Sequence, residues 1–371
     1  MHIVCSKENL QKGFNAVSKA VASRAILPIL SNVLFEATSD NKLKLSATDL
    51  EIGVETYVET QVLTSGKISL PARVLQDIIS KLPVDKDVEI QVNEFGTETL
   101  LKCGRSKFNL KSLNADDFPP LPQLDIDNSV QLNRELMAQG IKKTIFAAST
   151  DTTKNVLNGV KLYLNNEKLE MAATDGYRLA VKTIHSESKA EQGFSVIVPS
   201  RALNELSRLL SLGKEEMITV SQLANQLVFG IDDKILSTRL IEGQYPDYNR
   251  IIPKNLDKIL SFDRAEFLST VDRVAAISSV EKVNLVKMEI KNNEVTLSSS
   301  TPESGQSDET IEVNYQGDHF EINFNARFLM DAVRNFDTEQ INFHLAGSLS
   351  PGILKGNDDE TYFCMIMPIR S

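Results

Sequence analysis

The chain has 371 residues, of which 42% are hydrophobic and 24% are charged, and its formal net charge is −10. At about 100–200 residues per domain, this length predicts a globular protein of two to four domains. No apolar run approaches the roughly 20 residues that span a bilayer, and the N-terminus lacks the regions of a secretion signal, so we expect a cytoplasmic protein without a membrane partner.

The first predicted helix lies within residues 7–22, where an apolar residue recurs every three or four positions. A second helix is predicted to begin at Ala72, because Pro71 stands where a missing N–H costs nothing. Alternating segments such as 88–92 and 99–102, separated by turn residues, predict strands. Strands therefore outnumber helices in this first part of the chain.

The same pattern returns twice along the chain. The segment Lys42–Asp49 (KLKLSATD) resembles Lys168–Asp175 (KLEMAATD), and a weaker copy, Glu294–Thr301 (EVTLSSST), follows. Each step is 126 residues. A single repeated block could arise by chance, so further blocks decide whether the repeat is real.

Two more blocks recur in the same order. A short strand followed by a proline or asparagine, a small residue and arginine occurs three times, at Pro71, Pro199 and Asn325. Residues 107–119 also resemble residues 234–246, which lie 127 positions later. Three blocks in one order predict three domains, which we place at residues 1–124, 125–251 and 252–371.

Each repeat contains two predicted helices among strands, so the predicted fold class is α+β, with three repeated domains in which two helices are backed by antiparallel sheets. The six helical segments carry a net charge of +6 over 78 residues, which leaves −16 on the other 293. The helices are thus basic in an acidic protein. The segments are residues 7–22, 72–82, 133–147, 200–210, 263–276 and 326–336.

Motifs for catalysis are absent from the sequence. It contains no phosphate-binding loop, no dinucleotide fingerprint and no metalloprotease motif. The three cysteines are far apart, which argues against disulfides and zinc, and the four histidines are isolated. We therefore expect no catalytic residue, no metal and no cofactor.

Basic residues on a helix face have two readings. Amphipathic helices often carry Lys and Arg on their solvated face without any further role. Recurrence of the spacing in all three repeats, as in the pairs Arg201 and Arg208 or Lys12 and Lys19, favours a face directed at nucleic acid. The segment 263–276 departs from this pattern because it is not basic.

The whole chain resembles one family, the bacterial β sliding clamps, which are processivity subunits of the replicative DNA polymerase. The resemblance rests on six motifs in this order: SRAILPILSN (23–32), LPARVLQDIISKLP (70–83), FNLKSLNADDFPPLP (108–122), AATDGYRLA (172–180), YPDYNRIIP (245–253) and MPIR (367–370). Where the family typically ends in Leu, this chain ends in Ser371.

The resemblance implies a head-to-tail homodimer, a ring of six domains whose helices line the hole. Twelve helices spaced about 9 Å apart leave an opening of about 24 Å, whereas six leave only about 7 Å. Only the larger ring admits a DNA duplex. For the seam between the two copies we expect contacts at Phe108, Leu110 and Ile277.

Modest positive charge inside a ring attracts any DNA sequence without stopping it from sliding. We expect the DNA-facing residues to be Lys12, Arg24, Arg73, Lys81, Lys142, Lys143, Arg201 and Arg208. The resemblance further implies a peptide-binding cleft between the second and third domains, where methionines and aliphatic side chains adapt to varied partners and arginines orient the peptide. Its lining is predicted to be Leu157, Thr174, Gly176, Tyr177, Arg178, Leu179, Pro246, Arg250, Ile251, Met365, Met367, Pro368, Ile369 and Arg370.

The implied partners are a second copy, duplex DNA, the DNA polymerase III α subunit, the clamp loader, and other DNA polymerases and repair proteins. Two other functions stay open at this point. One is a hydrolase or nuclease at acidic pairs such as Asp116–Asp117, and the other is a monomeric scaffold that binds proteins only. A mass in solution of about twice 41.2 kDa would separate a ring from a scaffold.

Overall fold

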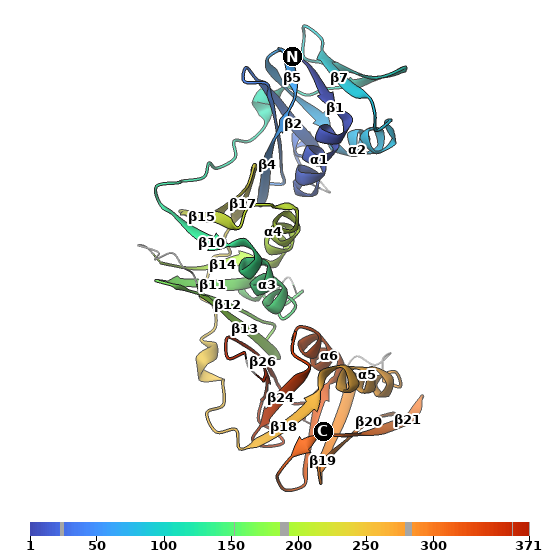
Figure 1. Ribbon diagram of the computed structural model, residues 1–371, viewed down its shortest axis with the longest axis vertical. Helices are drawn as coiled ribbons and strands as arrows, with labels where there is room; N and C mark the ends of the chain where they lie inside the picture. Colours follow the sequence, from blue (N-terminus) through green and yellow to red (C-terminus); the bar gives the residue numbers. More distant parts are fainter. Residues whose placement is uncertain (23–25, 152, 186–192, 279–283, 358, 371) are drawn as a thin grey trace. The chain divides into compact units, whose positions relative to one another are not determined.

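The computed structural model describes residues 1–371 apart from 23–25, 152, 186–192, 279–283, 358 and 371 (Figure 1). The described chain divides into two compact units. The first comprises Met1–Glu135 with Asn204–Leu240, and the second comprises Leu136–Leu203 with Ile241–Ser371. Arg24 and Ser371 lie outside the described residues. No helix in the described part of the chain is long and apolar enough to cross a membrane.

The first unit contains two antiparallel sheets. The five-stranded sheet has the order β5 (Gln61–Thr64), β1 (His2–Ser6), β7 (Asp87–Val92), β8 (Glu98–Cys103), β9 (Ser106–Lys111). The eight-stranded sheet has the order β10 (Ser129–Asn133), β15 (Met217–Leu223), β16 (Gln226–Ile231), β17 (Lys234–Arg239), β4 (Ile52–Glu59), β3 (Lys42–Thr48), β2 (Asn32–Thr38), β6 (Gly66–Pro71). Helix α1 (Lys7–Val17) packs against α2 (Ala72–Lys81) and against β3 and β4.

The second unit also contains two antiparallel sheets. The nine-stranded sheet has the order β14 (Phe194–Pro199), β11 (Gly159–Asn165), β12 (Lys168–Thr174), β13 (Arg178–His185), β26 (Tyr362–Ile366), β25 (Gly352–Gly356), β24 (Gln340–Leu345), β18 (Lys258–Asp263), β22 (Asn314–Tyr315). The four-stranded sheet has the order β21 (Gly305–Glu312), β20 (Glu294–Thr301), β19 (Leu285–Lys291), β23 (Phe320–Asn325). Helix α5 (Arg264–Ala275) packs against α6 (Ala326–Arg334) and against β20 and β21.

Helices α3 (Arg134–Ile145) and α4 (Ser200–Leu212) complete the set of six α-helices among the described residues. The predicted α+β class, with two helices in each repeat, is confirmed. The second helix begins at Ala72 as predicted, with Pro71 as its N-terminal cap residue. The first ends earlier than predicted, at Val17, and Ser18–Ala20 continue as a 3₁₀ turn.

Two strand pairings join neighbouring repeats. Strand β17 pairs antiparallel with β4, with Lys234 opposite Thr56, and β26 pairs antiparallel with β13, with Tyr362 opposite Lys182. In each pairing, one strand comes from the repeated block at 234–246 or its C-terminal copy. The other strand belongs to the preceding repeat and follows the block at 42–49 or its copy at 168–175. Because these sheets are continuous across repeats, the central repeat is divided between the two compact units.

The predicted domain boundaries fall in the connections from β9 to β10 and from β17 to β18. They remain predictions, because the compact units follow the continuous sheets rather than the repeats.

Candidate functional site

Residues far apart in the sequence meet in one apolar cluster of the second unit. Leu179 on β13 lies directly opposite Met365 on β26, and each side chain is 1% exposed. Tyr245 is part of the same buried cluster, and Leu157 packs at its margin. Three residues predicted for the cleft, Leu157, Leu179 and Met365, thus lie in one apolar cluster. Tyr245, which precedes the predicted Pro246, belongs to the same cluster, and we call this cluster the apolar floor.

The TDGYR motif makes a tight turn between β12 and β13. The Asp175 carboxylate accepts the N–H groups of Tyr177 and Arg178 at 2.9 and 3.0 Å. Gly176 has φ +96°, a left-handed conformation that favours glycine, and its N–H donates to the Thr174 hydroxyl at 3.0 Å. The turn presents Tyr177, which is 60% exposed, beside the apolar floor.

The exposed Tyr177 ring has defined neighbours. Lys154 Nζ lies 5.3 Å from the ring centroid, and the Phe328 ring stacks on it at 6.5 Å between centroids. The Tyr177 carbonyl accepts the N–H of Met367 at 2.8 Å. Tyr177 therefore connects the turn to the C-terminal segment.

The C-terminal segment changes character at the end of β26. Met365 and Ile366 are buried in the strand, whereas Met367 is 36% exposed. Pro368 and Ile369 are half-buried and Arg370 is exposed. The Ile369 N–H donates to the Asn323 carbonyl at 2.8 Å, which fixes the path of the segment. The C-terminal segment thus belongs to a buried strand up to Ile366 and lies at the protein surface from Met367 to Arg370.

The segment that leads into the third repeat is anchored by two tyrosines. The Thr174 N–H donates to the Tyr245 hydroxyl at 3.0 Å, and the Tyr248 hydroxyl donates to the Glu170 carboxylate. Burial raises the pKa of both tyrosines, so the hydroxyls stay neutral donors and acceptors.

Three predicted residues of that segment face solvent. Pro246 is exposed, Ile251 is 51% exposed, and the Arg250 side chain is 84% exposed with its Nε 2.8 Å from Asp247. We define the peptide surface as Leu157, Tyr177, Leu179, Met365 and Met367.

Arg178 is held by two carboxylates. Its side chain is only 12% exposed, and its guanidinium lies 3.0 Å from Asp175 and 2.7 Å from Asp331 of α6. It also stacks over the Phe328 ring at 4.6 Å. Both carboxylates pair with its charge, so Arg178 holds the turn and α6 together, and its part in orienting a peptide stays a prediction.

Five of the eight basic residues predicted to face DNA are exposed on helices. Lys12 is paired with Glu8 at 2.5 Å on an exposed helical face, and the others stand on α2, α3 and α4. The five exposed residues are Lys12, Arg73, Lys81, Lys142 and Arg201.

Two of the predicted basic residues are largely shielded from solvent. Lys143 is 7% exposed, and its ammonium lies 2.9 Å from Asp337 and 3.7 Å from Asp359, so little of it is left to contact DNA. The Arg208 side chain is half-buried, pairs with Glu205 and donates to the Ala16 carbonyl at 2.6 Å. The charged groups of Lys143 and Arg208 are thus paired with groups of the chain itself.

The residues predicted for the dimer seam also differ among themselves. Phe108 on β9 and Ile277 after α5 are half-buried, so each retains apolar area for a partner. Leu110 is 7% exposed in the single chain. Its side chain has little area left to bury, and its place in the seam stays a prediction.

Comparison with known proteins gives one answer along the whole chain. Models of the DNA polymerase III beta subunit match residues 1–122 (N-terminal domain), 131–247 (central domain) and 249–370 (C-terminal domain). The beta sliding clamp of Staphylococcus epidermidis is 33% identical, over 100% of both chains. That of Synechococcus elongatus is 38% identical, over 73% of this chain and 72% of the relative. The solved beta sliding clamp of C. crescentus has a TM-score of 0.94 and 34% identity, over 100% of both chains.

Proposed function

The chain belongs to the family of bacterial β sliding clamps, the non-catalytic β subunits of DNA polymerase III, and on that premise we propose that it works as a homodimeric ring around duplex DNA. In this role it tethers the replicative polymerase to its template. The chain itself needs no cofactor for tethering, and its place of work is the cytoplasm, where bacterial DNA lies.

Two edge strands carry the dimer proposal. Strand β9 ends the five-stranded sheet and β21 ends the four-stranded sheet. In sequence, β9 is the counterpart of β17 and β26, and β21 is the counterpart of β4 and β13. Those counterparts already pair twice within the chain, as β17 with β4 and β26 with β13. Pairing of β9 with β21 of the partner subunit, and the reverse, completes the same pattern head to tail.

The charges of the two edges support this pairing. Strand β9 carries Lys107 and Lys111, whereas β21 carries Asp308, Glu309 and Glu312. Opposite charges across an interface fix register and speed association. The internal register, Lys234 opposite Thr56 and Tyr362 opposite Lys182, sets Lys107 opposite Asp308 of the partner subunit once the repeat spacing is applied. An open strand edge also requires cover, since exposed edges invite aggregation.

The exposed basic helix residues support sequence-independent DNA contact. Lys12, Arg73, Lys81, Lys142 and Arg201 are spread over four helices of a chain whose net charge is −10. A few dispersed cations attract phosphates weakly and release few counterions, which suits a protein that must slide. Arg24, outside the described residues, is proposed to act with them.

The peptide surface supports docking of several partners. Buried Leu179 and Met365 give it an apolar floor, while Leu157, Tyr177 and Met367 offer partly exposed apolar area. Methionine adapts its shape to different side chains, which favours a surface shared by many partners. We propose that the polymerase α subunit, the clamp loader, other polymerases and repair proteins each place a short apolar segment here, with Arg250 and Arg370 at its polar end.

Retention on circular DNA tests the proposal. The protein is loaded on a nicked plasmid with a bacterial clamp loader and ATP, washed in moderate salt, and the plasmid is then cut once. Release only after cutting is the expected result, because a ring slides off a free end. Equal retention before and after cutting would mean direct binding, and no loading at all would favour a protein-only scaffold.

A further inference from the structure

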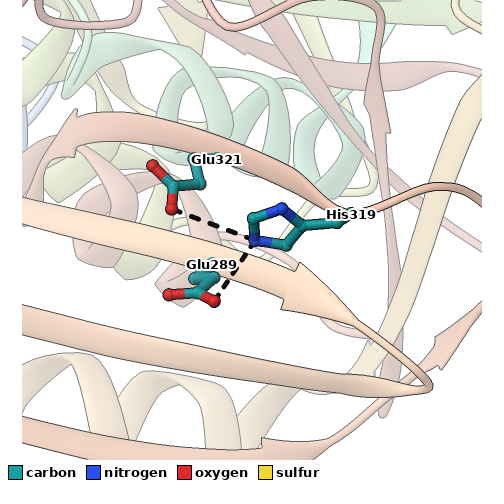
Figure 2. Close-up of side chains that lie close together, drawn as sticks. All are labelled: Glu289, His319 and Glu321. Carbon is teal, nitrogen blue, oxygen red and sulfur yellow. Dashed lines mark hydrogen bonds and ion pairs between the residues drawn. The ribbon is translucent and has the colours of Figure 1, made fainter.

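Three side chains able to bind a metal meet on the four-stranded sheet of the second unit. Glu289 on β19 lies directly opposite Glu321 on β23, and His319 precedes β23. Figure 2 shows one nitrogen of the His319 ring directed at both carboxylates, with Nε2 3.2 Å from Glu289 Oε1 and 3.9 Å from Glu321 Oε1. One ligand atom from each residue lies within 4.8 Å of the others.

Sequence spacing alone concealed this cluster, because its members are up to 32 positions apart. The β19–β23 register brings them together. Alternation along β19 sends Lys287, Glu289 and Lys291 to one face, and the cross-strand neighbour of Glu289 on that face is Glu321. Two carboxylates directly opposite each other repel, so this face requires compensating positive charge.

In the single chain, two lysines supply that charge. Lys291 Nζ lies 3.1 Å from Glu289 Oε1, and Lys287 Nζ lies 2.9 Å from Glu321 Oε2. Both lysine side chains are well exposed, at 51% and 39%. Exposed pairs of this kind contribute little free energy, so the lysines can turn to solvent at small cost.

The position of His319 is set by a buried anchor. Tyr315 is 3% exposed, its hydroxyl donates to the Asp318 carbonyl at 2.9 Å, and its N–H donates to the Asn293 side chain at 3.1 Å. The turn that carries His319 is therefore tied to the sheet at the residue next to it. Such support holds a ligand's backbone in place while its exposed ring adjusts.

We propose that Glu289, His319 and Glu321 bind a divalent transition-metal ion of the Zn²⁺ class. One imidazole nitrogen and two carboxylate oxygens suit this class, whereas Mg²⁺ and Ca²⁺ select oxygen ligands only. Ligand atoms about 2.1 Å from a tetrahedral ion are about 3.4 Å apart, close to the separations that His319 already has from both carboxylates. Rotation of the Glu289 and Glu321 side chains, which are 30% and 46% exposed, brings the two carboxylates together, and water supplies the fourth ligand.

A doubly charged ion between the carboxylates supplies the positive charge that the two lysines otherwise provide. It also fastens the start of β23 to β19, so binding stabilises the folded C-terminal repeat by mass action. None of the three residues belongs to the peptide surface or to the exposed basic residues of the helices.

Titration of the full-length protein with Zn²⁺ alone tests the site. His2 provides a matched control, because its Nε2 lies 2.9 Å from Glu89 and that glutamate also holds Lys102, but no second carboxylate among the described residues completes a triad. We compare the wild type with His319→Gln, Glu321→Gln and His2→Gln by calorimetry and by the thermal midpoint with and without the ion.

The wild type and His2→Gln are expected to bind one ion with equal affinity and to gain the same rise in midpoint. His319→Gln and Glu321→Gln are expected to lose roughly tenfold or more in affinity and to lose the rise, with unchanged midpoints in a chelator. The proposal is overturned by no binding to the wild type, by equal binding to all four proteins, or by a loss in His2→Gln as large as in His319→Gln.

Discussion

The Arg178 guanidinium on β13 lies 2.7 Å from the Asp331 carboxylate on α6, and this pair ties the second repeat to the third. Arg178 also holds Asp175, the residue that organises the turn bearing Tyr177. The exposed aromatic ring of the peptide surface is thus positioned by an ion pair between two repeats.

Replacement of Asp331 by Asn is expected to lower stability by about 1–2 kcal/mol, since a mostly buried guanidinium loses one of its two carboxylates. The thermal midpoint should fall, and the affinity for the polymerase α subunit should fall with it because the Tyr177 turn loosens. Glu8→Gln removes an exposed pair on α1 and serves as the control, with no measurable change expected. An unchanged midpoint for Asp331→Asn would show that the pair is not a structural tie.

The edge-strand charges predict a dimer that can be broken and repaired. Lys107→Glu sets like charges opposite Asp308 of the partner subunit, so sedimentation at low micromolar concentration should show a monomer. Combining it with Asp308→Lys should restore the dimer, and salt should weaken the wild-type dimer. Lys86→Glu, an exposed reversal outside β9, is the control. A double variant that stays monomeric would rule out this register.

Neighbouring lysines on α3 are predicted to behave oppositely. Lys142→Ala removes an exposed cation, so DNA retention should become weaker and less dependent on salt while stability is unchanged. Lys143→Ala leaves Asp337 and Asp359 without their shared ammonium, and should lower stability by about 2–3 kcal/mol. Parallel retention and thermal unfolding measurements separate the two effects. If Lys143→Ala weakened retention without loss of stability, its assignment as a structural residue would be wrong.

Local patterns predicted the fold well because local chemistry decides it. The helix after Pro71 and the turn at Asp175–Arg178 follow from residues next to them in the chain. The burial of a particular side chain does not follow from its neighbours in the sequence. Lys142 and Lys143 differ in which of them meets carboxylates brought from the third repeat, and the burial of Leu110 is a property of the folded chain. His319 looked isolated because β-sheet register, not sequence spacing, places it beside two glutamates.

Tyr177 and Met367 are predicted to bind partners through apolar area. Substituting either by Ala should weaken binding of the polymerase α subunit about 5- to 20-fold, as expected for a partly exposed aromatic or apolar anchor. Sedimentation of the same variants without DNA or partner proteins tests dimer formation alone and is expected to be unchanged. Tyr163→Ala, a 41% exposed tyrosine on β11, is the matched control. Equal effects at Tyr163 and Tyr177 would indicate non-specific binding through exposed tyrosines and would contradict a defined peptide surface.

Stability is predicted to fall in acid through the carboxylates around Lys143. The hydrogen bond from Lys143 lowers the pKa of Asp337. For Asp359, burial pushes the pKa upward, but hydrogen bonding from Thr361 and the Lys182 charge outweigh it and the pKa is lowered. Groups with a folded pKa below the unfolded value of about 3.9 stabilise the protein above that pH and lose this contribution as the pH falls through the folded pKa.

Urea unfolding of the wild type and of an Asp337→Asn, Asp359→Asn double variant, from pH 7 down to pH 3, checks this dependence. The wild type should be the more stable protein at pH 7, and the difference should shrink steadily below about pH 4, because protonated aspartates no longer pair with Lys143 or Lys182. A difference that stayed constant over the whole range would mean that the charges of these two carboxylates do not contribute to folding, and that Lys143 is held by packing against the Tyr362 ring, 5.0 Å from its ammonium.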